Sequence, residues 1–243
     1  MIWYEVTDST NDRVKELAKN GAAEGTAVAA AGQTGGRGRR GRTFYSPAGT
    51  GMYLSYLFRP ETAVEKCMHL TCACAVAAAR AIGDLCGITP GIKWPNDLCF
   101  EGKKLGGILT EISAEAGTLL WAVVGIGINC RTPEGGFPPE IAQIAQSLEA
   151  VSGRSADPRL LAQKMVEELG KDLLFNPKAY MEEYRRLCVT TGKPVQVITP
   201  TCVREGFAEK VDDEGGLLVH YPDGTRETVN SGEVSVRGMY GYL

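Results

Sequence analysis

The run GGRGRRGRTF at residues 35–44 constrains the chain more than any other stretch. It sets four arginines among glycines within six positions, namely Arg37, Arg39, Arg40 and Arg42. Glycines let backbone amides close on a ligand, and arginines offer forked donors to carboxylate or phosphate oxygens. Because strands are expected on both sides, we interpret the run as a loop that binds an anion, with a phosphorylated anion favoured.

Composition makes this loop a local site and not part of a basic surface. The 243 residues are 44% hydrophobic and 23% charged, which is typical of a soluble globular protein with one domain or one domain plus a small appendage. A formal net charge of -3 and a pI of about 5.6 argue against a general nucleic-acid coat. The sequence suggests no leader and no apolar stretch of about 20 residues, so we expect a cytoplasmic protein without a membrane span.

The eight cysteines are expected to be reduced thiols, several of them in the core. A zinc site at Cys67, His69, Cys72 and Cys74 is the alternative. These residues show no paired C-x-x-C spacing and lie in an alanine-rich stretch that indicates a helix. We therefore expect buried small side chains here and no metal site.

The pattern of apolar residues predicts a succession of strands and helices up to about residue 192. The predicted elements are strands at 2–6, 51–58 and 118–130, a hairpin at 97–113 turning at Glu101–Gly102, and helices at 11–20, at 64–87 and after Asp157–Pro158 and Asn176–Pro177.

Two finer features accompany these elements. Ser9 and Asp12 have the spacing of a capping box, which predicts that their side chains accept hydrogen bonds from backbone N–H groups at the start of the first helix. The Gly/Pro-rich stretch at 131–140 is expected to form a mobile flap.

The character of the chain changes near residue 192, which indicates a small second domain. Short β runs at 194–199, 206–211, 216–221 and 225–229 are separated by the turns DDEGG and PDG. Short strands with such turns are typical of a small β-barrel. We therefore predict domains at 1–191 and 192–243.

Several common catalytic signatures fail in this sequence. GRGRRG at 36–41 matches G-x-G-x-x-G literally, but it continues as a loop where a dinucleotide fold needs a helix. No Walker A motif occurs, and His69 and His220 neighbour no evident nucleophile. A solvated or RNA-binding RG tract remains an alternative for the loop, which its brevity and flanking strands disfavour.

A second constellation lies in KWPNDLCFEGKKLGG. Pro95 fixes a turn that can aim Asn96 and Asp97, and Lys104 follows in the hairpin. Ordinary surface lysines on a hairpin are the alternative.

Glycines inside the predicted strands add to this constellation. Gly106 and Gly107, and likewise Gly125 and Gly127, weaken a strand unless something approaches its backbone closely. We interpret that approaching group as a ligand.

Six motifs, taken together and in this order, resemble those of a biotin protein ligase. They are DSTN at 8–11, GRGRRGR at 36–42, KWPND at 93–97, KLGGIL at 104–109, GIGIN at 125–129 and SGEVSVR at 231–237. The resemblance implies an α+β fold, with a mixed β-sheet catalytic domain of the class II synthetase-like, biotin/lipoate ligase type and a small C-terminal SH3-like β-barrel. Because DSTN begins at residue 8, we expect the form that lacks an N-terminal helix-turn-helix domain and binds no DNA.

The resemblance also implies a two-step reaction. Biotin and ATP, the latter with Mg2+, give biotinyl-5'-adenylate, and a lysine of a biotin carboxyl carrier protein domain then takes the biotin. We expect that carrier domain of a biotin-dependent carboxylase as the partner, and no permanently bound cofactor. Related proteins form dimers through sheet edges, which leaves a homodimer open.

The lack of an RR-x-SGGGAV-type loop disfavours a lipoate ligase or octanoyl transferase, and the retained arginines and Lys104 disfavour a noncatalytic sensor.

By the same resemblance, Lys104 and Arg39 are the expected catalytic residues, with Lys104 bridging the biotin carboxylate and the α-phosphate. The implied biotin-binding residues are Ser9, Thr10, Asn11, Gln33, Arg37, Gly38, Arg39, Lys104 and Gly107. The implied ATP-binding residues are Arg40, Arg42, Asn96, Lys104, Asn129 and Arg237, with Glu233 beside them. From the chemistry of its carboxylate alone, and not from the resemblance, Asp97 is expected to assist magnesium or to orient the lysine nucleophile. Phe44 stands where the best-studied bacterial members carry tryptophan, which leaves its stacking on adenine open.

Overall fold

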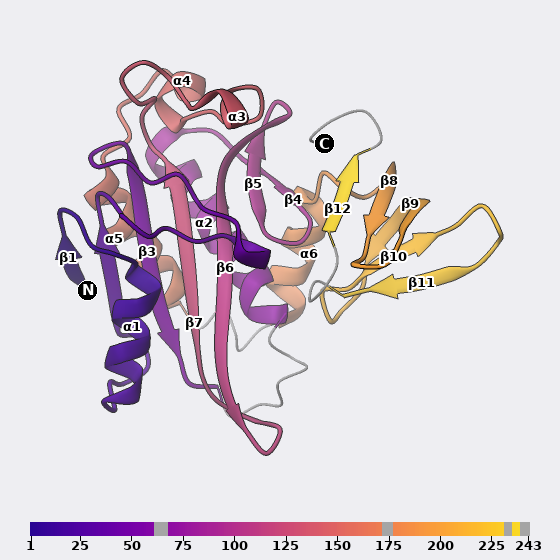
Figure 1. The fold of residues 1–243 in the computed structure, drawn as a ribbon, viewed down its shortest axis with the longest axis horizontal. Coiled ribbons are helices and arrows are strands. Elements are labelled where there is room, and N and C mark those ends of the chain that lie inside the picture. Colours follow the sequence, from indigo (N-terminus) through magenta and orange to yellow (C-terminus); the bar gives the residue numbers. More distant parts are fainter. Residues whose placement is uncertain (61–67, 172–176, 231–234, 239–243) are drawn as a thin grey trace.

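A computed structural model describes residues 1–60, 68–171, 177–230 and 235–238, and two sheets organise them (Figure 1). The larger sheet has the order β1-β2-β3-β7-β6-β5-β4; β1 and β2 run parallel and the other neighbours antiparallel. Its strands are β1 (Ile2–Tyr4), β2 (Ala27–Ala30), β3 (Gly51–Phe58), β4 (Gly91–Lys93), β5 (Asp97–Phe100), β6 (Lys103–Glu115) and β7 (Thr118–Asn129). The predicted apolar stretch at 118–130 is therefore the central strand.

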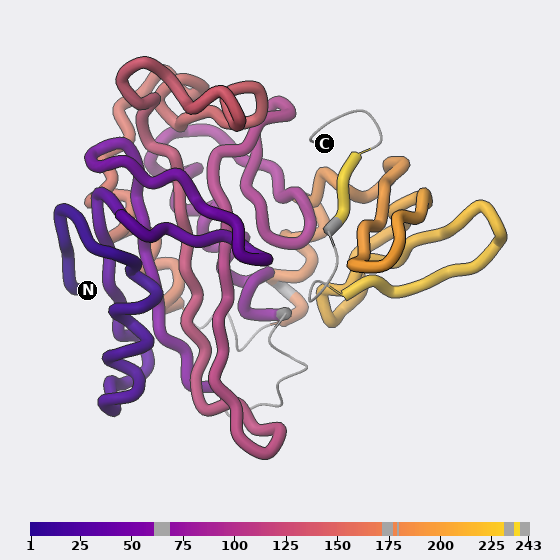
Figure 2. The backbone as a smooth tube through the Cα atoms, viewed as in Figure 1, coloured from indigo at the N-terminus to yellow at the C-terminus, as the bar shows by residue number. Residues whose placement is uncertain are grey.

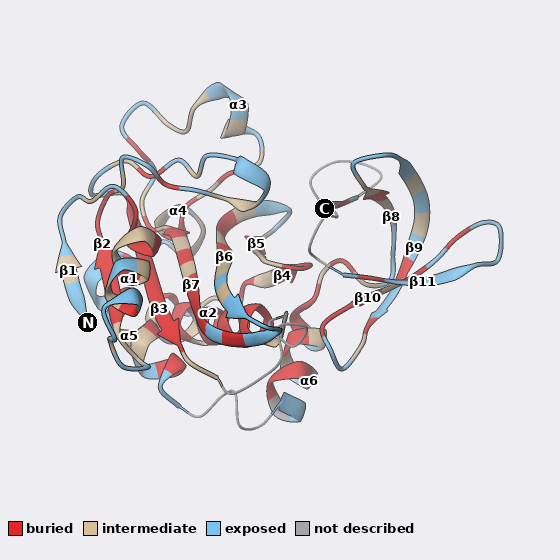
Figure 3. Ribbon diagram, turned by 60° about the horizontal axis from the view of Figure 1, so that its bottom comes forward, coloured by how far each residue is buried: buried red, intermediate tan, exposed pale blue. Residues whose placement is uncertain are grey.

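Helices cover both faces of this sheet. On one face α1 (Thr10–Lys19) packs against β2, β3 and β7. On the other, α2 (Met68–Cys86) and α5 (Pro158–Leu169) pack against the sheet, and α6 (Pro177–Leu187) packs on α2. Strand β3 separates two cores, because Leu57 joins the α1 cluster whereas its neighbours on either side join the α2 cluster. Figure 3 shows β3 buried along its length.

The smaller sheet forms the C-terminal SH3-like barrel, at the right of Figures 1 and 2, with antiparallel order β11-β10-β9-β8-β12. Its strands are β8 (Lys193–Ile198), β9 (Val203–Val211), β10 (Leu217–His220), β11 (Arg226–Val229) and β12 (Ser235–Gly238). The predicted short β runs after residue 192 are thus strands. Together with the mixed sheet, the barrel confirms the predicted α+β fold.

The hairpin between β5 and β6 turns where the sequence indicates. Glu101 and Gly102 both have positive φ, at 46° and 81°, the conformation of a two-residue turn that matches the twist of its strands. Helices α5 and α6 begin at Pro158 and Pro177, as predicted. Two short helices, α3 (Pro139–Ala142) and α4 (Leu148–Ser152), lie between β7 and α5 and were not predicted.

Helix α2 is long and apolar enough to cross a membrane by length and composition, over His69–Cys86, although the sequence was not expected to offer such a stretch. Within this window, 72% of the residues are buried inside the protein, so packing against the sheet and α5 accounts for the apolar character. Cys72 and Cys74 are free and buried there, and Cys67 lies outside the described residues. Among the described residues, no group of three or more His, Cys, Asp or Glu side chains could hold a metal ion.

The predicted capping box at α1 is wrong. Ser9 is the N-cap residue, but its side chain makes no capping hydrogen bond. The amide of Ser9 donates to Asp8 Oδ1 at 2.7 Å, which takes the place expected for Asp12. The carboxylate of Asp12 instead accepts from Arg37, because a guanidinium lies within reach across the loop.

The ligand expected at Gly106 is also wrong, because the group that approaches is the neighbouring strand. A Cβ atom at Gly106 would lie 2.3 Å from the carbonyl oxygen of Gly127 and 2.6 Å from Ile128 Cδ1. Gly106 therefore allows β6 to pair closely with β7. Gly107 differs, since its nearest neighbours are the site residues Asp97 and Lys104, at 3.2 and 3.3 Å.

We expect Gly106→Ala to destabilise the protein by about 1–3 kcal/mol, because backbone cannot move aside as a flexible side chain does. Gly83→Ala in α2 is the matched control: its Cβ would meet only an ordinary contact at 3.6 Å, and alanine favours a helix by about 0.5–1 kcal/mol. Urea unfolding measures both. Equal midpoints for the two variants would contradict the close strand approach.

Candidate active site

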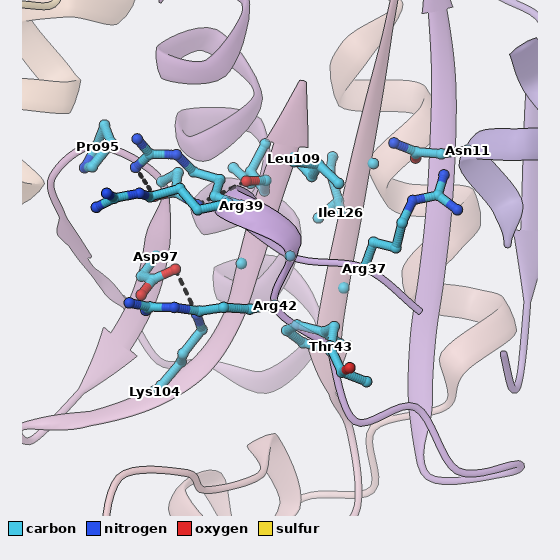
Figure 4. A pocket seen from close by; sticks show the side chains of 18 of the residues that line it. Asn11, Arg37, Arg39, Arg42, Thr43, Pro95, Asp97, Lys104, Leu109 and Ile126 are labelled. Atoms are coloured by element: carbon cyan, nitrogen blue, oxygen red, sulfur yellow. Dashed lines mark hydrogen bonds and ion pairs between the residues drawn. The ribbon is translucent and has the colours of Figure 1, made fainter. Parts of the chain in front are cut away.

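A cavity of about 600 Å³ lies between α1, the arginine loop, the turn at 93–97, and strands β6 and β7 (Figure 4). Val236 and Arg237 of β12 also line it, so both sheets contribute to one wall. The residues predicted for biotin or ATP that line the cavity are Ser9, Thr10, Asn11, Gln33, Arg37, Gly38, Arg39, Arg40, Arg42, Asn96, Lys104, Gly107 and Arg237.

Two predicted residues are not among those lining the cavity. Asn129, at the end of β7, donates from its side-chain amide to the carbonyl oxygen of Gln146 at 3.1 Å. Its contact with ATP therefore stays a prediction without geometric support. Glu233 lies outside the described residues.

The cavity is strongly cationic. Of the described residues that line it, seven are arginine or lysine and one, Asp97, is acidic. This excess stands in a chain of formal net charge -3. A concave site lined by one sign of charge attracts ligands of the opposite sign, so the site suits a polyanion.

Asn11 holds one end of the cavity through a buried polar network. Ser55, which is fully buried on β3, donates to Asn11 Oδ1 at 2.5 Å. Thr10 donates to Gln33 Oε1 through both its amide and its hydroxyl, at 2.8 and 3.1 Å. Gly125 of β7 provides the space for the Asn11 side chain, because a Cβ atom at this position would lie 2.2 Å from Asn11 Oδ1. These small polar groups present donors and acceptors suited to a neutral polar ring.

Phe44 lines the cavity and lies against β7. A Cβ atom at Gly127 would lie 2.9 Å from the Phe44 ring, and Tyr53 meets that ring edge-on with centroids 6.3 Å apart. The Nζ atom of Lys104 lies 6.0 Å from the ring centroid. The absence of a side chain at Gly127 thus leaves space for the Phe44 ring, and Gly127 also lines the cavity.

The opposite end of the cavity is built from an ion pair and a hydrogen-bonded arginine. Lys104 Nζ donates to Asp97 Oδ1 at 2.6 Å, and Arg39 Nη1 donates to Asn96 Oδ1 at 3.1 Å. Asn96 in turn donates to the carbonyl oxygen of Ile108 at 2.8 Å. The arginine loop, the KWPND turn and the hairpin therefore meet at one place, as the resemblance implied. Figure 4 shows Arg39 and Arg42 extended toward Pro95 and Asp97.

The KWPND turn rests on the C-terminal barrel. The indole of Trp94, which is 2% exposed, donates to the carbonyl oxygen of Gly215 at 2.9 Å. The hydroxyl of Tyr184 in α6 donates to the carbonyl oxygen of Pro95 at 3.0 Å. The turn between β9 and β10 thereby supports the residues that carry Asn96 and Asp97.

Sequence reasoning missed three polar residues of the site and its surroundings: Ser55, Lys93 and Glu111. Ser55 lies within an apolar strand, so only its position opposite Gly125 in the sheet could have singled it out. Glu111 reads as an ordinary polar residue of a strand, and its partners come from other elements. Lys93 was quoted within KWPND but given no role.

Lys93 is a buried cation facing the cavity, with 9% of its surface exposed. Burial lowers its pKa to about 8, and nearby Lys104 and Arg237 act in the same direction, whereas Asp97 opposes the shift. Lys93 is therefore largely neutral above pH 8 and charged below it. An anion in the cavity favours the charged form.

The sequence matches known proteins over most of its length. Residues 3–129 match the biotin/lipoate A/B protein ligase family, and residues 190–237 match the biotin protein ligase C terminal domain. The bifunctional ligase/repressor BirA of Bacillus subtilis is 36% identical over 93% of this chain and 71% of its own length. The biotin–[acetyl-CoA-carboxylase] ligase of Paracoccus denitrificans is 33% identical over 96% of this chain and 98% of its own.

The fold also matches solved structures. The biotin protein ligase from Aquifex aeolicus in complex with biotin and ATP superposes with a TM-score of 0.81 at 29% identity, covering 98% of both chains. A mixed sheet with a cationic cavity, beside an SH3-like barrel, is thus the architecture that this chain shares with a biotin protein ligase. The chain belongs to the biotin/lipoate A/B protein ligase family, within its biotin ligase branch.

The pKa of Lys93 gives a prediction for anion binding. Between pH 7 and 9 the free protein loses the Lys93 proton, and a bound polyanion restores it, so binding should weaken by up to about tenfold across this range. Calorimetry with inorganic sulfate, which stays a dianion throughout this range, in buffers of different ionisation enthalpy should show proton uptake at pH 8.5–9 and little at pH 6.5.

Lys93→Met should abolish the uptake, because it removes the titrating amine. Lys103→Met is the control, since Lys103 is exposed and does not line the cavity. Unchanged proton uptake in Lys93→Met would assign the titration to another group.

Proposed function

We propose that this protein activates biotin with ATP to biotinyl-5'-adenylate and then transfers the biotin to a lysine of a biotin carboxyl carrier protein domain. Family membership supports biotin ligation, and the names of the Paracoccus relative and the Aquifex structure support the substrates. One observation carries the proposal most directly: a cationic cavity with the small polar groups around Asn11 at one end and with Lys104 and Arg39 at the other.

The first step brings two anions together. A carboxylate oxygen of biotin attacks the α-phosphorus of ATP, a P–O bond forms, and pyrophosphate leaves with the electron pair of the broken bond. Two unit negative charges about 4 Å apart repel by roughly 4 kcal/mol at an effective dielectric constant near 20. Lys104 offsets this repulsion at the junction, and Arg39 closes over the reacting groups.

The remaining residues divide between the two substrates. The biotin head has one carbonyl acceptor and two N–H donors, which suit the small polar groups around Asn11. We assign to biotin Ser9, Thr10, Asn11, Gln33, Arg37, Gly38, Arg39, Lys104 and Gly107. We assign to ATP Arg40, Arg42, Asn96, Lys104 and Arg237. Phe44 offers a ring in the cavity wall for the nucleotide or the biotin chain to pack on.

ATP enters with Mg2+, which would offset part of the phosphate charge. Mg2+ is commonly bound through one or two carboxylates together with substrate phosphates, and it keeps several waters. Asp97, the acidic residue among the described lining residues, fits that requirement. We infer that the metal arrives with the nucleotide and that no cofactor stays bound.

In the second step the amine of the carrier lysine attacks the acyl carbon of the adenylate. An amide bond forms, AMP leaves, and the amine loses a proton. Asp97 is the candidate to orient that amine, because its carboxylate lines the cavity. If Lys104 leaves Asp97 to contact the substrates, the carboxylate can accept a hydrogen bond from the incoming amine instead. The acceptor is a carrier domain of a biotin-dependent carboxylase.

We further propose that residues 1–191 form the catalytic domain and 192–243 the SH3-like domain. We propose a cytoplasmic location. A homodimer through a sheet edge stays open.

The reaction can be tested with purified protein. Pyrophosphate should appear when biotin and ATP are added together and not with either alone. Mass spectrometry should show one biotin added to an isolated carrier domain, and none to a carrier whose target lysine is replaced. Biotin and ATP binding without pyrophosphate release would indicate a sensor in place of an enzyme.

Lys104→Ala should lower the adenylation turnover by about two to three orders of magnitude, because its charge is needed most in the transition state. Binding of biotin alone should weaken far less. Stopped-flow or steady-state pyrophosphate release measures the turnover.

Lys103→Ala is the internal control. Lys103 neighbours Lys104 on β6 but is exposed and points to the other face, so its variant should be nearly silent. Equal rates for the two variants would remove Lys104 from the catalytic role.

A further inference from the structure

Arg37 lies apart from the other arginines of its loop. Figure 4 shows its side chain turned toward Asn11, on the side away from Arg39 and Arg42. Its two terminal nitrogens donate to the two carboxylate oxygens of Asp12, each at 2.7 Å. Such a parallel pair fixes the orientation of the guanidinium as well as its position. Arg37 is therefore held by α1 in a single geometry.

A second carboxylate completes the site around Arg37. Glu111 of β6 accepts from Arg37 at 3.4 Å, and Lys15 bridges Asp12 and Glu111 at 2.9 Å to each. Two acids and two bases thus form a closed, charge-balanced group. Their side chains are 24–37% exposed, so bidentate geometry and the network, more than burial, give the group its strength.

The titration of these groups agrees with mutual stabilisation. The hydrogen bond from Arg37 holds the pKa of Asp12 well below its usual range. Burial raises the pKa of Glu111, but hydrogen bonds from Lys15 and Asn11 outweigh it and the net direction is downward. Both acids are charged at neutral pH, so Arg37 has its charge matched before any ligand arrives.

The group is joined directly to the polar end of the cavity. Asn11 Nδ2 donates to Glu111 Oε2 at 2.7 Å, the same carboxylate oxygen that faces Arg37. Asn11 Oδ1 is meanwhile held by Ser55. The acid of β6 therefore sets the side-chain amide of Asn11 and the first arginine of the loop at the same time.

We propose that Asp12 and Glu111 are positioning residues for biotin: they hold Arg37 against α1, and so anchor the start of the arginine loop over the biotin head. This inference rests on the proposed function. Arg37 then holds the start of the loop in place beside biotin, and the later arginines of the loop bind the phosphates of ATP. Asp12 itself does not line the cavity, so it acts only through its partners.

Calorimetric titration with biotin, and separately with ATP, tests the proposal on the full chain. Asp12→Ala should raise the Kd for biotin by about five- to tenfold, as expected for loss of a charge-assisted bidentate pair, and leave the Kd for ATP within about twofold. Asp12→Asn, which keeps the volume, should give a smaller rise of about threefold. Asp12→Glu should recover most of the affinity. Parallel losses for both ligands would overturn the assignment to biotin.

A double variant separates positioning from a general structural effect. If Asp12 acts through Arg37, adding Asp12→Ala to Arg37→Ala should change the Kd for biotin by less than about twofold. Additive losses would overturn the proposal. Glu16→Gln, one turn further along α1 and paired with Arg13, is the matched control and should leave biotin binding unchanged. Because binding is read without turnover, a protein that binds biotin but releases no pyrophosphate contradicts the proposed reaction and still tests this inference.

Discussion

The structure depends on one electrostatic constraint: many basic side chains that line one cavity must stand close together with few acids among them. Seven basic side chains line a cavity whose described wall carries one acid. Two like unit charges about 4 Å apart repel by roughly 4 kcal/mol at an effective dielectric constant near 20, unless they are paired or solvated. The protein meets the constraint by pairing the cations at the edges, Lys104 with Asp97 and Arg37 with Asp12. Each pair offsets one basic charge, and the described lining as a whole keeps an excess of basic side chains that can bind an anionic substrate.

The sheet supplies the second requirement, which is room for side chains close to a backbone. Gly125 makes space for Asn11 and Gly127 makes space for Phe44, both on the central strand β7. Gly106 serves a different end, since it lets β6 approach β7. The pairing of β6 with β7 thus fixes the relative positions of Asn11, the Phe44 ring and Lys104.

Much of this arrangement could be predicted from the sequence, because it is encoded locally. Turn residues placed the hairpin at Glu101–Gly102, proline placed the start of α5, and the order of the motifs indicated the family. The errors share a cause. The spacing of Ser9 and Asp12 predicts a capping box, but no local pattern shows that Arg37 lies across the loop. Likewise the glycines indicate a close approach, but not whether a strand, a side chain or a ligand approaches.

The interactions that remained hidden are those between distant parts of the chain, and they connect the barrel to the chemistry. Trp94 reaches Gly215 across 121 residues of sequence, and Arg185 of α6 donates to the carbonyl oxygen of Val211 at 2.8 Å. The turn between β9 and β10 therefore accepts hydrogen bonds from two other parts of the chain. One of them, Trp94, belongs to the KWPND turn, which carries Asn96 and Asp97. Since Val236 and Arg237 of the same barrel also line the cavity, the C-terminal sheet contributes two wall residues and supports the turn that carries Asn96 and Asp97. A catalytic sheet without this support would keep its lysine and arginines but lose the buried partner that fixes the position of Trp94.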